Sequence, residues 1–294
     1  MTAPADLEMI ARWCGRVPEL RRTGEMRWEA PVSGAVSYPE DGLSMVGEVE
    51  DRSYWFAHRN AAVLAMIERN PPPGPVFDIG GGNGFVSAGL IARGFPAVVI
   101  EPSPAGSAKA LARNVPTIAA AFQDLTLPSK SIPAAGLFDV LEHIEDDRGA
   151  LLRLHDALAP GGMLYLAVPT HAALWSQEDI EAGHFRRYTM GGLRRLLEET
   201  GFEPVFASYY FAAMILPILL LRALPYRLGL TGVRKTRSAD DHMLPENAAG
   251  RALQAGLEGE LKWLKNGRTV PAGASCLVGC RKAGQAAGST RAHA

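Results

Sequence analysis

The segment that decides the fold reads VFDIGGGNGF, at positions 76–85. A short apolar run leads into a glycine-rich stretch, and a helix-compatible segment follows it. We therefore predict a strand, a tight turn and a helix. Glycines let the chain turn sharply and let a ligand approach bare backbone, while the start of the helix offers N–H donors. The segment thus predicts a ligand site at the end of a strand.

The spacing of the glycines excludes two common nucleotide sites. A dinucleotide-binding turn requires G-x-G-x-x-G, and counted from Gly80 the third glycine would fall on Phe85. A phosphate-binding P-loop is excluded because no Lys-Ser or Lys-Thr pair follows. Asp78 inside the strand would sit badly against a pyrophosphate and well beside a cationic ligand.

Two more acids stand at the ends of predicted strands. Glu101 follows Gly80 by about 20 residues, the spacing at which a carboxylate binds a ribose hydroxyl. Asp124 follows the third strand, and ligands of such sheets bind at the carboxyl ends of the strands. Three acids without a compensating basic cluster suit an adenosine that carries a positive sulfonium.

Outward from this segment, strand and helix patterns alternate. The fold class predicted is α/β: a Rossmann-like, doubly wound, seven-stranded sheet that is mostly parallel with the last strand antiparallel. The predicted strands are 75–80, 97–102, 117–123, 131–138, 162–169, 202–211 and 275–282. The predicted helices are 50–70, 85–93, 105–113, 146–158, 189–199 and one around 248–265.

These patterns divide the chain into four parts. We expect an N-terminal helical cap or lid at 1–70, and a cofactor-binding domain at 71–211 plus 272–283. An apolar and helical insertion at 212–271 is too long for a hairpin, so we expect it to have its own structure. The tail at 284–294 is small and polar, and we predict disorder there.

The ordered motifs resemble the class I S-adenosylmethionine-dependent methyltransferases, in the branch similar to ubiquinone-biosynthesis O-methyltransferases. The resemblance covers about residues 50–205. SYPEDG (37–42), SYWFAHRN (53–60), FDVLEHIEDD (138–147) and GHFRRYT (183–189) also resemble uncharacterised bacterial methyltransferases. The insertion departs from the well-understood branch, so the acceptor does not carry over.

The resemblance implies S-adenosylmethionine as cofactor and a set of contacts to it. It implies that Asp78, Gly80 and Gly82 lie around the methionine moiety and that Glu101 binds the ribose hydroxyls. It also implies that Asp124 lies near the adenine amino group, that Phe138 makes a backbone contact to the cofactor, and that Arg59 pairs with the cofactor carboxylate.

Two histidines are the candidates for a general base, because histidine takes up a proton near neutral pH. His143 lies in the Glu142-His143 pair, which could also be a helix start packed under the cofactor. A divalent ion on Asp139, Glu142 and His143, as in some relatives, is a further alternative, although we predict no metal site. His184 lies in HFRRY at 184–188, where surface salt bridges or substrate gating through His184, Arg187 or Tyr188 are the alternatives.

The apolar stretch at 205–221 carries no charge. Three interpretations stay open: a buried strand followed by a buried helix, a surface for a lipid-like substrate or peripheral membrane contact through 205–224, and a transmembrane span. Pro217 and the short length argue against the span.

Composition sets the remaining limits. The chain has 294 residues, 47% of them hydrophobic, and a net charge of −1, so no electrostatic pattern supports a nucleic-acid partner. The 3 cysteines form no C-x-x-C pair, and together with the lack of a signal peptide they predict a cytoplasmic protein.

The function predicted is an S-adenosylmethionine-dependent methyltransferase acting on a small or amphiphilic acceptor, with O-methylation favoured. The alternative is a cofactor-binding scaffold or membrane-associated interaction protein without turnover. A third class, an NAD-dependent oxidoreductase, is disfavoured by Phe85 and Asp78. The oligomeric state is open.

Overall fold

The computed structural model describes residues 2–31, 50–230 and 247–283. The SYPEDG segment at 37–42, part of the insertion and the tail at 284–294, where disorder was predicted, lie outside the described residues.

The described strands form one sheet in the order β1-β2-β5-β4-β3-β6-β7-β9-β8. Strand β9 runs antiparallel to both of its neighbours, which confirms the predicted antiparallel last strand. The strands are β1 (Arg21–Gly24), β2 (Arg27–Glu29), β3 (Val76–Ile79), β4 (Ala97–Ile100), β5 (Thr117–Ala119), β6 (Ile132–Phe138), β7 (Leu158–Pro169), β8 (Phe202–Tyr210) and β9 (Ser275–Lys282).

The sheet has two strands more than the seven predicted. Strands β1 and β2 form a hairpin, and β2 pairs in parallel with β5 at the sheet edge. Both strands are short and rich in arginine, so no apolar alternation announces them. The segment predicted as a helical cap therefore extends the sheet as well.

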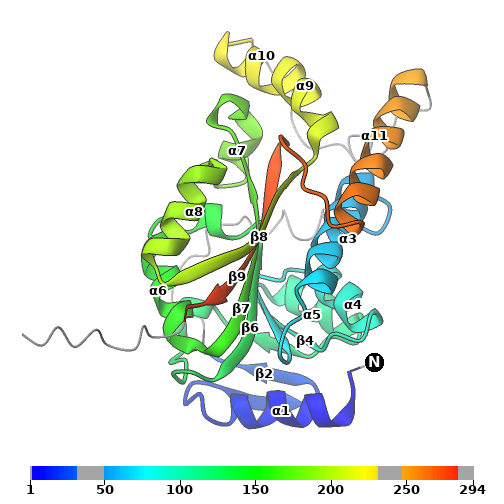
Figure 1. Ribbon diagram of the computed structural model, residues 1–294. Coiled ribbons are helices and arrows are strands. Elements are labelled where there is room, and N and C mark those ends of the chain that lie inside the picture. The colour runs from blue at the N-terminus through cyan, green and yellow to red at the C-terminus, as the bar shows by residue number, and fades with distance from the viewer. Residues whose placement is uncertain (1, 32–49, 231–246, 284–294) are drawn as a thin grey trace, which may run out of the picture.

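Helices cover both faces of the sheet, with α6 and α8 on one side and α3, α4 and α11 on the other (Figure 1). The α-helices are α1 (Pro4–Cys14), α3 (Tyr54–Arg69), α4 (Phe85–Ala92), α5 (Pro104–Ala112), α6 (Asp147–Ala157), α7 (Gln177–Glu181), α8 (Met190–Glu199), α9 (Ile215–Ile218), α10 (Leu224–Arg227) and α11 (Ala248–Lys265). Four 3₁₀ turns and one π turn complete them: η1 (Phe122–Asp124), η2 (Leu141–His143), η3 (Ala172–Leu174), η4 (Ala212–Met214) and the π turn η5 (Leu219–Ala223).

Each face of the sheet has its own core. Trp13 of α1 packs edge-on against Phe77 of β3, in the cluster that also buries the inner faces of α6 and α8. The other cluster joins α3 and α4 to Leu257 and Leu264 of α11. The helix predicted at 189–199 is α8, and Thr189 is its N-cap, since the Thr189 side chain accepts a hydrogen bond from the Gly192 N–H.

The apolar stretch divides into a strand and a broken helix. Its first half is β8, as predicted, and its second half runs through α9, η5 and α10. Met214, Ile218 and Ala223 are buried there, whereas one row of leucines is exposed. A fully buried helix was therefore wrong for this half. No described helix is long and apolar enough to cross a membrane.

The insertion is fastened to the fold by one buried carboxylate. Glu260 of α11 accepts hydrogen bonds from the backbone N–H groups of Phe211 and Ala212, both at 2.7 Å. The same carboxylate lies 2.7 Å from Nε2 of His58 in α3. Trp55 of α3 stacks on Phe211 with ring centroids 3.9 Å apart. Helix α11 and the start of the insertion thus lock onto α3.

Candidate active site

The glycine turn follows β3 and forms the start of the site. Gly80, Gly82 and Gly84 all have positive φ angles, in the left-handed region that side chains disfavour. A Cβ atom on Gly80 would also lie 2.9 Å from a methyl group of Val140. The backbone can therefore adopt this turn only with glycine, as the sequence predicted.

Asp78 is buried beneath this turn. Its Oδ2 accepts a hydrogen bond of 2.7 Å from the Ser87 hydroxyl in α4. Burial raises the pKa of Asp78 to about 7, with smaller contributions from the negative charges of Glu101 and Glu50. A positive charge placed here would favour the ionised carboxylate.

Glu101 stands at the end of β4 and is 5% exposed. Its Oε2 accepts a 3.0 Å hydrogen bond from the Gly82 N–H, and its Oε1 accepts a 2.8 Å bond from the Ser103 N–H. Burial raises the pKa of Glu101, while these two donors oppose the rise. The carboxylate is therefore held directly against the glycine turn.

Arg59 of α3 reaches the same edge of the sheet. Its Nη1 donates to Oδ2 of Asp139 at 2.7 Å, and the guanidinium lies over the ring of Phe56. Its Nε is buried and donates to no residue that the structure describes. The side chain therefore keeps a donor for a further partner.

Phe138 and Asp124 end the neighbouring strands. Phe138 is buried at the end of β6, where its ring covers Gly136. Asp124 closes η1 after β5 and is half-buried, and its negative charge acts on Arg153. Arg153 itself donates to the backbone carbonyls of Gln123 and Leu125, which fixes this turn.

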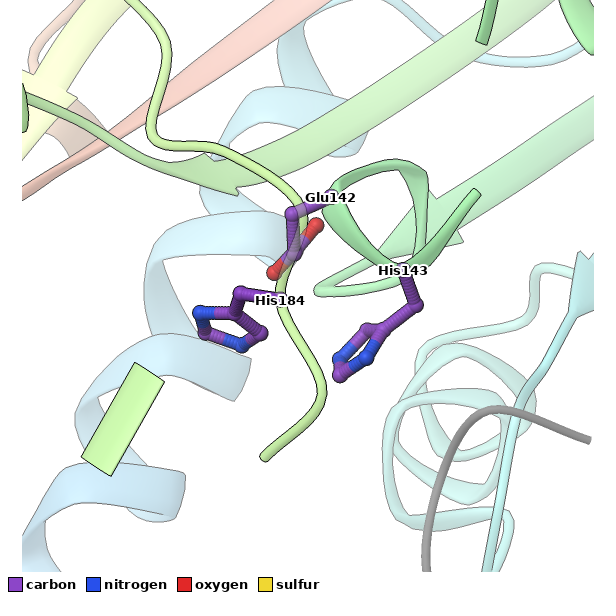
Figure 2. A group of neighbouring side chains, drawn as sticks. All are labelled: Glu142, His143 and His184. Atoms are coloured by element: carbon purple, nitrogen blue, oxygen red, sulfur yellow. The ribbon is translucent and has the colours of Figure 1, made fainter. Parts of the chain in front are cut away.

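A second cluster joins two segments that are far apart in the sequence. Glu142 and His143 come from η2, and His184 comes from the loop after α7 (Figure 2). The two imidazole rings meet edge to face at an interplanar angle of 77°, with centroids 4.7 Å apart. The two histidines predicted separately therefore lie together, whereas the Asp139 carboxylate pairs with Arg59 instead.

Glu142 is the most buried member of the cluster, at 1% exposure. Neither of its carboxylate oxygens accepts a hydrogen bond from any residue of the described ranges. Burial raises the pKa of Glu142 well above its usual value, and the charge of Asp139 raises it further.

Asp179 of α7 orients His184 from behind. Its Oδ1 lies 2.8 Å from Nδ1 of His184 and accepts a second hydrogen bond, also of 2.8 Å, from Nε of Arg187. Because a carboxylate only accepts, Nδ1 carries the hydrogen and Nε2 of the neutral ring keeps its lone pair. Arg187 therefore forms an ion pair, but with a buried carboxylate rather than in the surface salt bridge that was one of the alternatives.

Comparison with known proteins decides the family. A family defined by its methyltransferase domain matches residues 52–206, more than half of the chain. The chain belongs to this methyltransferase family. A probable S-adenosylmethionine-dependent methyltransferase of Mycobacterium tuberculosis is 24% identical over 200 residues, which cover 65% of this chain and 72% of that protein.

Solved structures share the fold at low identity. A protein of Haloferax volcanii, assigned as a methyltransferase and solved with the Trm112 methyltransferase activator, has a TM-score of 0.56 at 13% identity, with coverage of 87% and 100%. Phosphoethanolamine N-methyltransferase 2 of Haemonchus contortus, solved with S-adenosyl-L-methionine, has a TM-score of 0.51 at 16% identity, with coverage of 84% and 58%.

S-adenosylmethionine is the cofactor of this class I methyltransferase, as the sequence predicted. The residues at the sheet edge fit it. Two buried acids, Asp78 and Glu101, lie beside the glycine turn, where the glycines carry no side chain to cover the backbone. The N–H at Nε of Arg59 is available to bind an anion. A cationic nucleoside with a free carboxylate complements that set of charges.

The sequence did not reveal three residues of this methyltransferase that support the site. Ser87 bonds Asp78, Glu50 is a buried acid beside Arg59, and Asp179 holds His184. Ser87 stands in the first turn of α4, and Asp179 stands five residues before His184, so spacing offered a weak signal for both. No sequence signal places Glu50 in the site.

Proposed function

We propose that this methyltransferase transfers the methyl group to an oxygen atom of a small amphiphilic acceptor. The observation that carries the proposal is the pairing of His143 and His184 beside the buried carboxylate of Glu142. Such a group of side chains can take a proton from a hydroxyl, and an oxygen nucleophile requires that help. A carbon or nitrogen acceptor would have less need of it.

We assign the cofactor contacts to the sheet edge. Asp78, Gly80 and Gly82 lie around the methionine moiety, Glu101 binds the ribose hydroxyls, and Arg59 binds the carboxylate. Asp124 lies near the adenine amino group, and Phe138 contributes backbone. The hydrogen bond from Gly82 to Glu101 supports this assignment, because it holds the glycine turn and the ribose acid together.

The protein's part in the reaction is to orient the acceptor and remove its proton. When bound, S-adenosylmethionine supplies an electrophilic methyl group on a positive sulfur that becomes a neutral thioether. Nε2 of His184 is the atom best prepared to accept the hydroxyl proton, since Asp179 fixes the opposite nitrogen. His143 is the second candidate.

An apolar part of the acceptor is supported by the insertion. Six leucines of the insertion are at least 41% exposed: Leu216, Leu220, Leu221, Leu224, Leu228 and Leu230. Arg222 in the same segment pairs with Glu178 of α7, directly beside Asp179. The apolar surface is therefore linked to α7, the helix whose Asp179 bonds His184. Figure 1 shows α9 and α10 at the same end of the molecule as α7.

Replacing Leu216, Leu220 and Leu224 together with glutamine tests this acceptor class. The buried face of the segment stays intact in that variant. We expect turnover of a long-chain hydroxylated acceptor to fall at least about tenfold, because each lost leucine contact is worth on the order of 1 kcal/mol. Leu152 of α6, which is 46% exposed, gives the matched control Leu152→Gln with unchanged turnover. Equal turnover in both variants contradicts the amphiphilic acceptor.

The same leucine surface favours a second candidate function, a cofactor-binding protein that contacts a membrane surface without turnover. Apolar patches of this kind mark interaction sites. Co-sedimentation with phosphatidylcholine vesicles, lost in the triple glutamine variant, together with tight cofactor binding and no methyl transfer to any acceptor tried, would support this candidate. Absence of vesicle binding would contradict the expectation of peripheral membrane contact through residues 205–224.

A further inference from the structure

We propose that Glu142, His143 and His184 bind a divalent transition-metal ion. Each of these residues offers one ligand atom, and all three atoms lie within 4.8 Å of one another. Two ligand atoms bound to one ion at about 2.1 Å can be at most about 4.2 Å apart, so small side-chain rotations complete the set. Figure 2 shows the three side chains converging from two separate segments.

The strongest support is the state of Glu142. This carboxylate is 99% removed from solvent, yet neither oxygen accepts a hydrogen bond from a residue in the described part of the chain. A buried carboxylate without donors is costly, and buried charges are as a rule paired or coordinate metals. An ion between Glu142 and the two imidazoles would give this carboxylate a cationic partner.

The nearest arginines have other carboxylates as partners. Arg187 donates to Asp179 at 2.8 Å, and Arg59 donates to Asp139 at 2.7 Å. Both act on Glu142 only through space. Since neither guanidinium bonds to Glu142, the position beside its oxygens is left for another cation.

The contact behind His184 also matches a metal ligand. Histidines that bind metals usually donate the other ring N–H to a carboxylate, which fixes the ring and its tautomer. Asp179 does this for His184 at 2.8 Å and is itself fully buried. Nε2 is therefore the nitrogen directed to the ion.

The donor set selects the kind of metal. Imidazole nitrogens suit zinc, iron and related ions, whereas magnesium and calcium prefer oxygen ligands. Two histidines and one carboxylate leave further coordination positions open. The sequence predicted no metal site and offered Asp139, Glu142 and His143 only as an alternative set of ligands. The structure keeps Glu142 and His143 in the cluster and brings His184 to it in place of Asp139. Asp139 pairs with Arg59 instead.

One consequence rests on the function proposed above. A metal ion at the cluster would bind the acceptor hydroxyl and lower its pKa, so that its proton leaves to solvent more readily. His143 and His184 would then act as ligands rather than as bases. The acceptor oxygen would attack the methyl carbon while the carbon–sulfur bond breaks and its electrons remain on sulfur.

Metal binding can be measured without turnover. The full chain without a polyhistidine tag, stripped with a chelator, is titrated by calorimetry with ZnCl₂, MnCl₂ and MgCl₂. CoCl₂ provides a visible absorption spectrum as an independent report. We expect one equivalent of Zn²⁺ to bind at least about 100-fold more tightly than Mg²⁺, and Mn²⁺ to bind less tightly than Zn²⁺.

Variants locate the site. His184→Ala and Glu142→Gln should weaken transition-metal binding at least about 100-fold, and Asp179→Asn about 10- to 100-fold. His155→Ala is the matched control, because His155 lies on α6 and packs against Phe202 of β8 instead of joining the cluster. This variant should bind the metal as the wild type does. Thermal unfolding and cofactor affinity verify that each variant is folded.

The outcomes separate this inference from the proposed function. No stoichiometric transition-metal binding, or equal loss in His184→Ala and His155→Ala, overturns the metal site. Methyl transfer that is indifferent to chelator overturns the role of the ion in the reaction, not its binding, and leaves proton removal to the two histidines. Tight metal binding without transfer to any hydroxylated acceptor keeps the metal site and overturns the oxygen acceptor.

Discussion

The glycine edge of the sheet (Asp78, Gly80, Gly82 and Glu101) and the proposed acceptor side (the Glu142, His143 and His184 cluster with the insertion at 212–271) are built in different ways. At the glycine edge, Asp78 bonds Ser87 nine residues away and Glu101 bonds Gly82 nineteen residues away. On the acceptor side, His58 meets Glu260 across 202 residues. One region is held by neighbours within a single strand–helix–strand unit, and the other by distant segments brought together.

This difference implies that the two regions respond separately to substitution. A change at the glycine edge should alter cofactor affinity and leave the insertion in place. A change in the contacts of the insertion should alter the acceptor side and leave the cofactor grip intact. The following predictions test that separation.

Glu260→Ala should have the largest effect on stability. It removes the acceptor for two backbone N–H groups and for His58, and breaking such a buried network costs about 3–5 kcal/mol. Urea unfolding measures the loss. Glu258→Ala, on the exposed face of the same helix, should cost under about 0.5 kcal/mol. A loss below about 1 kcal/mol for Glu260→Ala would contradict the role given to this carboxylate.

Asp78 should make stability depend on pH. Its pKa of about 7 in the folded protein lies above the ordinary value of 3.8, so the native state binds a proton that the unfolded state has released. The free energy of unfolding should therefore fall by about 2 kcal/mol as the pH rises from about 5 to about 7. Urea titrations across this range should show a shallower dependence for Asp78→Asn. Identical slopes for both proteins would contradict the assigned burial.

Arg222→Ala should have the smallest effect on stability. The Arg222–Glu178 pair is about one-third exposed on each side, so its loss should cost less than about 1 kcal/mol. The apolar helices would then be less firmly held beside α7. We expect KM for an amphiphilic acceptor to rise a few-fold at constant cofactor affinity, in steady-state assays. A parallel loss of cofactor affinity would show that the two regions are not separate.

The sequence predicted the glycine edge almost completely because its determinants are local. Strand β3, the turn, Glu101 and the order of the alternating strands all follow from short patterns. The hairpin of β1 and β2 was missed because two short arginine-rich strands carry no apolar period.

The acceptor side could be predicted only in part. His143 and His184 were identified as candidates, but their contact depends on the path of the loop after β7, which spacing does not encode. The role of Asp179 behind His184 was missed for a different reason, because a separation of five residues is only a weak signal of contact. The second half of the apolar stretch was expected to be either buried or exposed. In the structure it is a broken helix with one buried face, which includes Ile218, and one exposed face, which includes Leu221.

The central claim is that S-adenosylmethionine is held at the glycine edge by Glu101, independently of the histidine cluster. Calorimetric titration of the cofactor into three proteins tests it directly. We expect wild type and His184→Ala to bind the cofactor with affinities within about twofold of each other. Glu101→Ala should bind it about 100-fold more weakly, because the two charge-assisted hydrogen bonds proposed between Glu101 and the ribose hydroxyls are lost. Unchanged affinity in Glu101→Ala, or no heat for the wild type, would contradict the account.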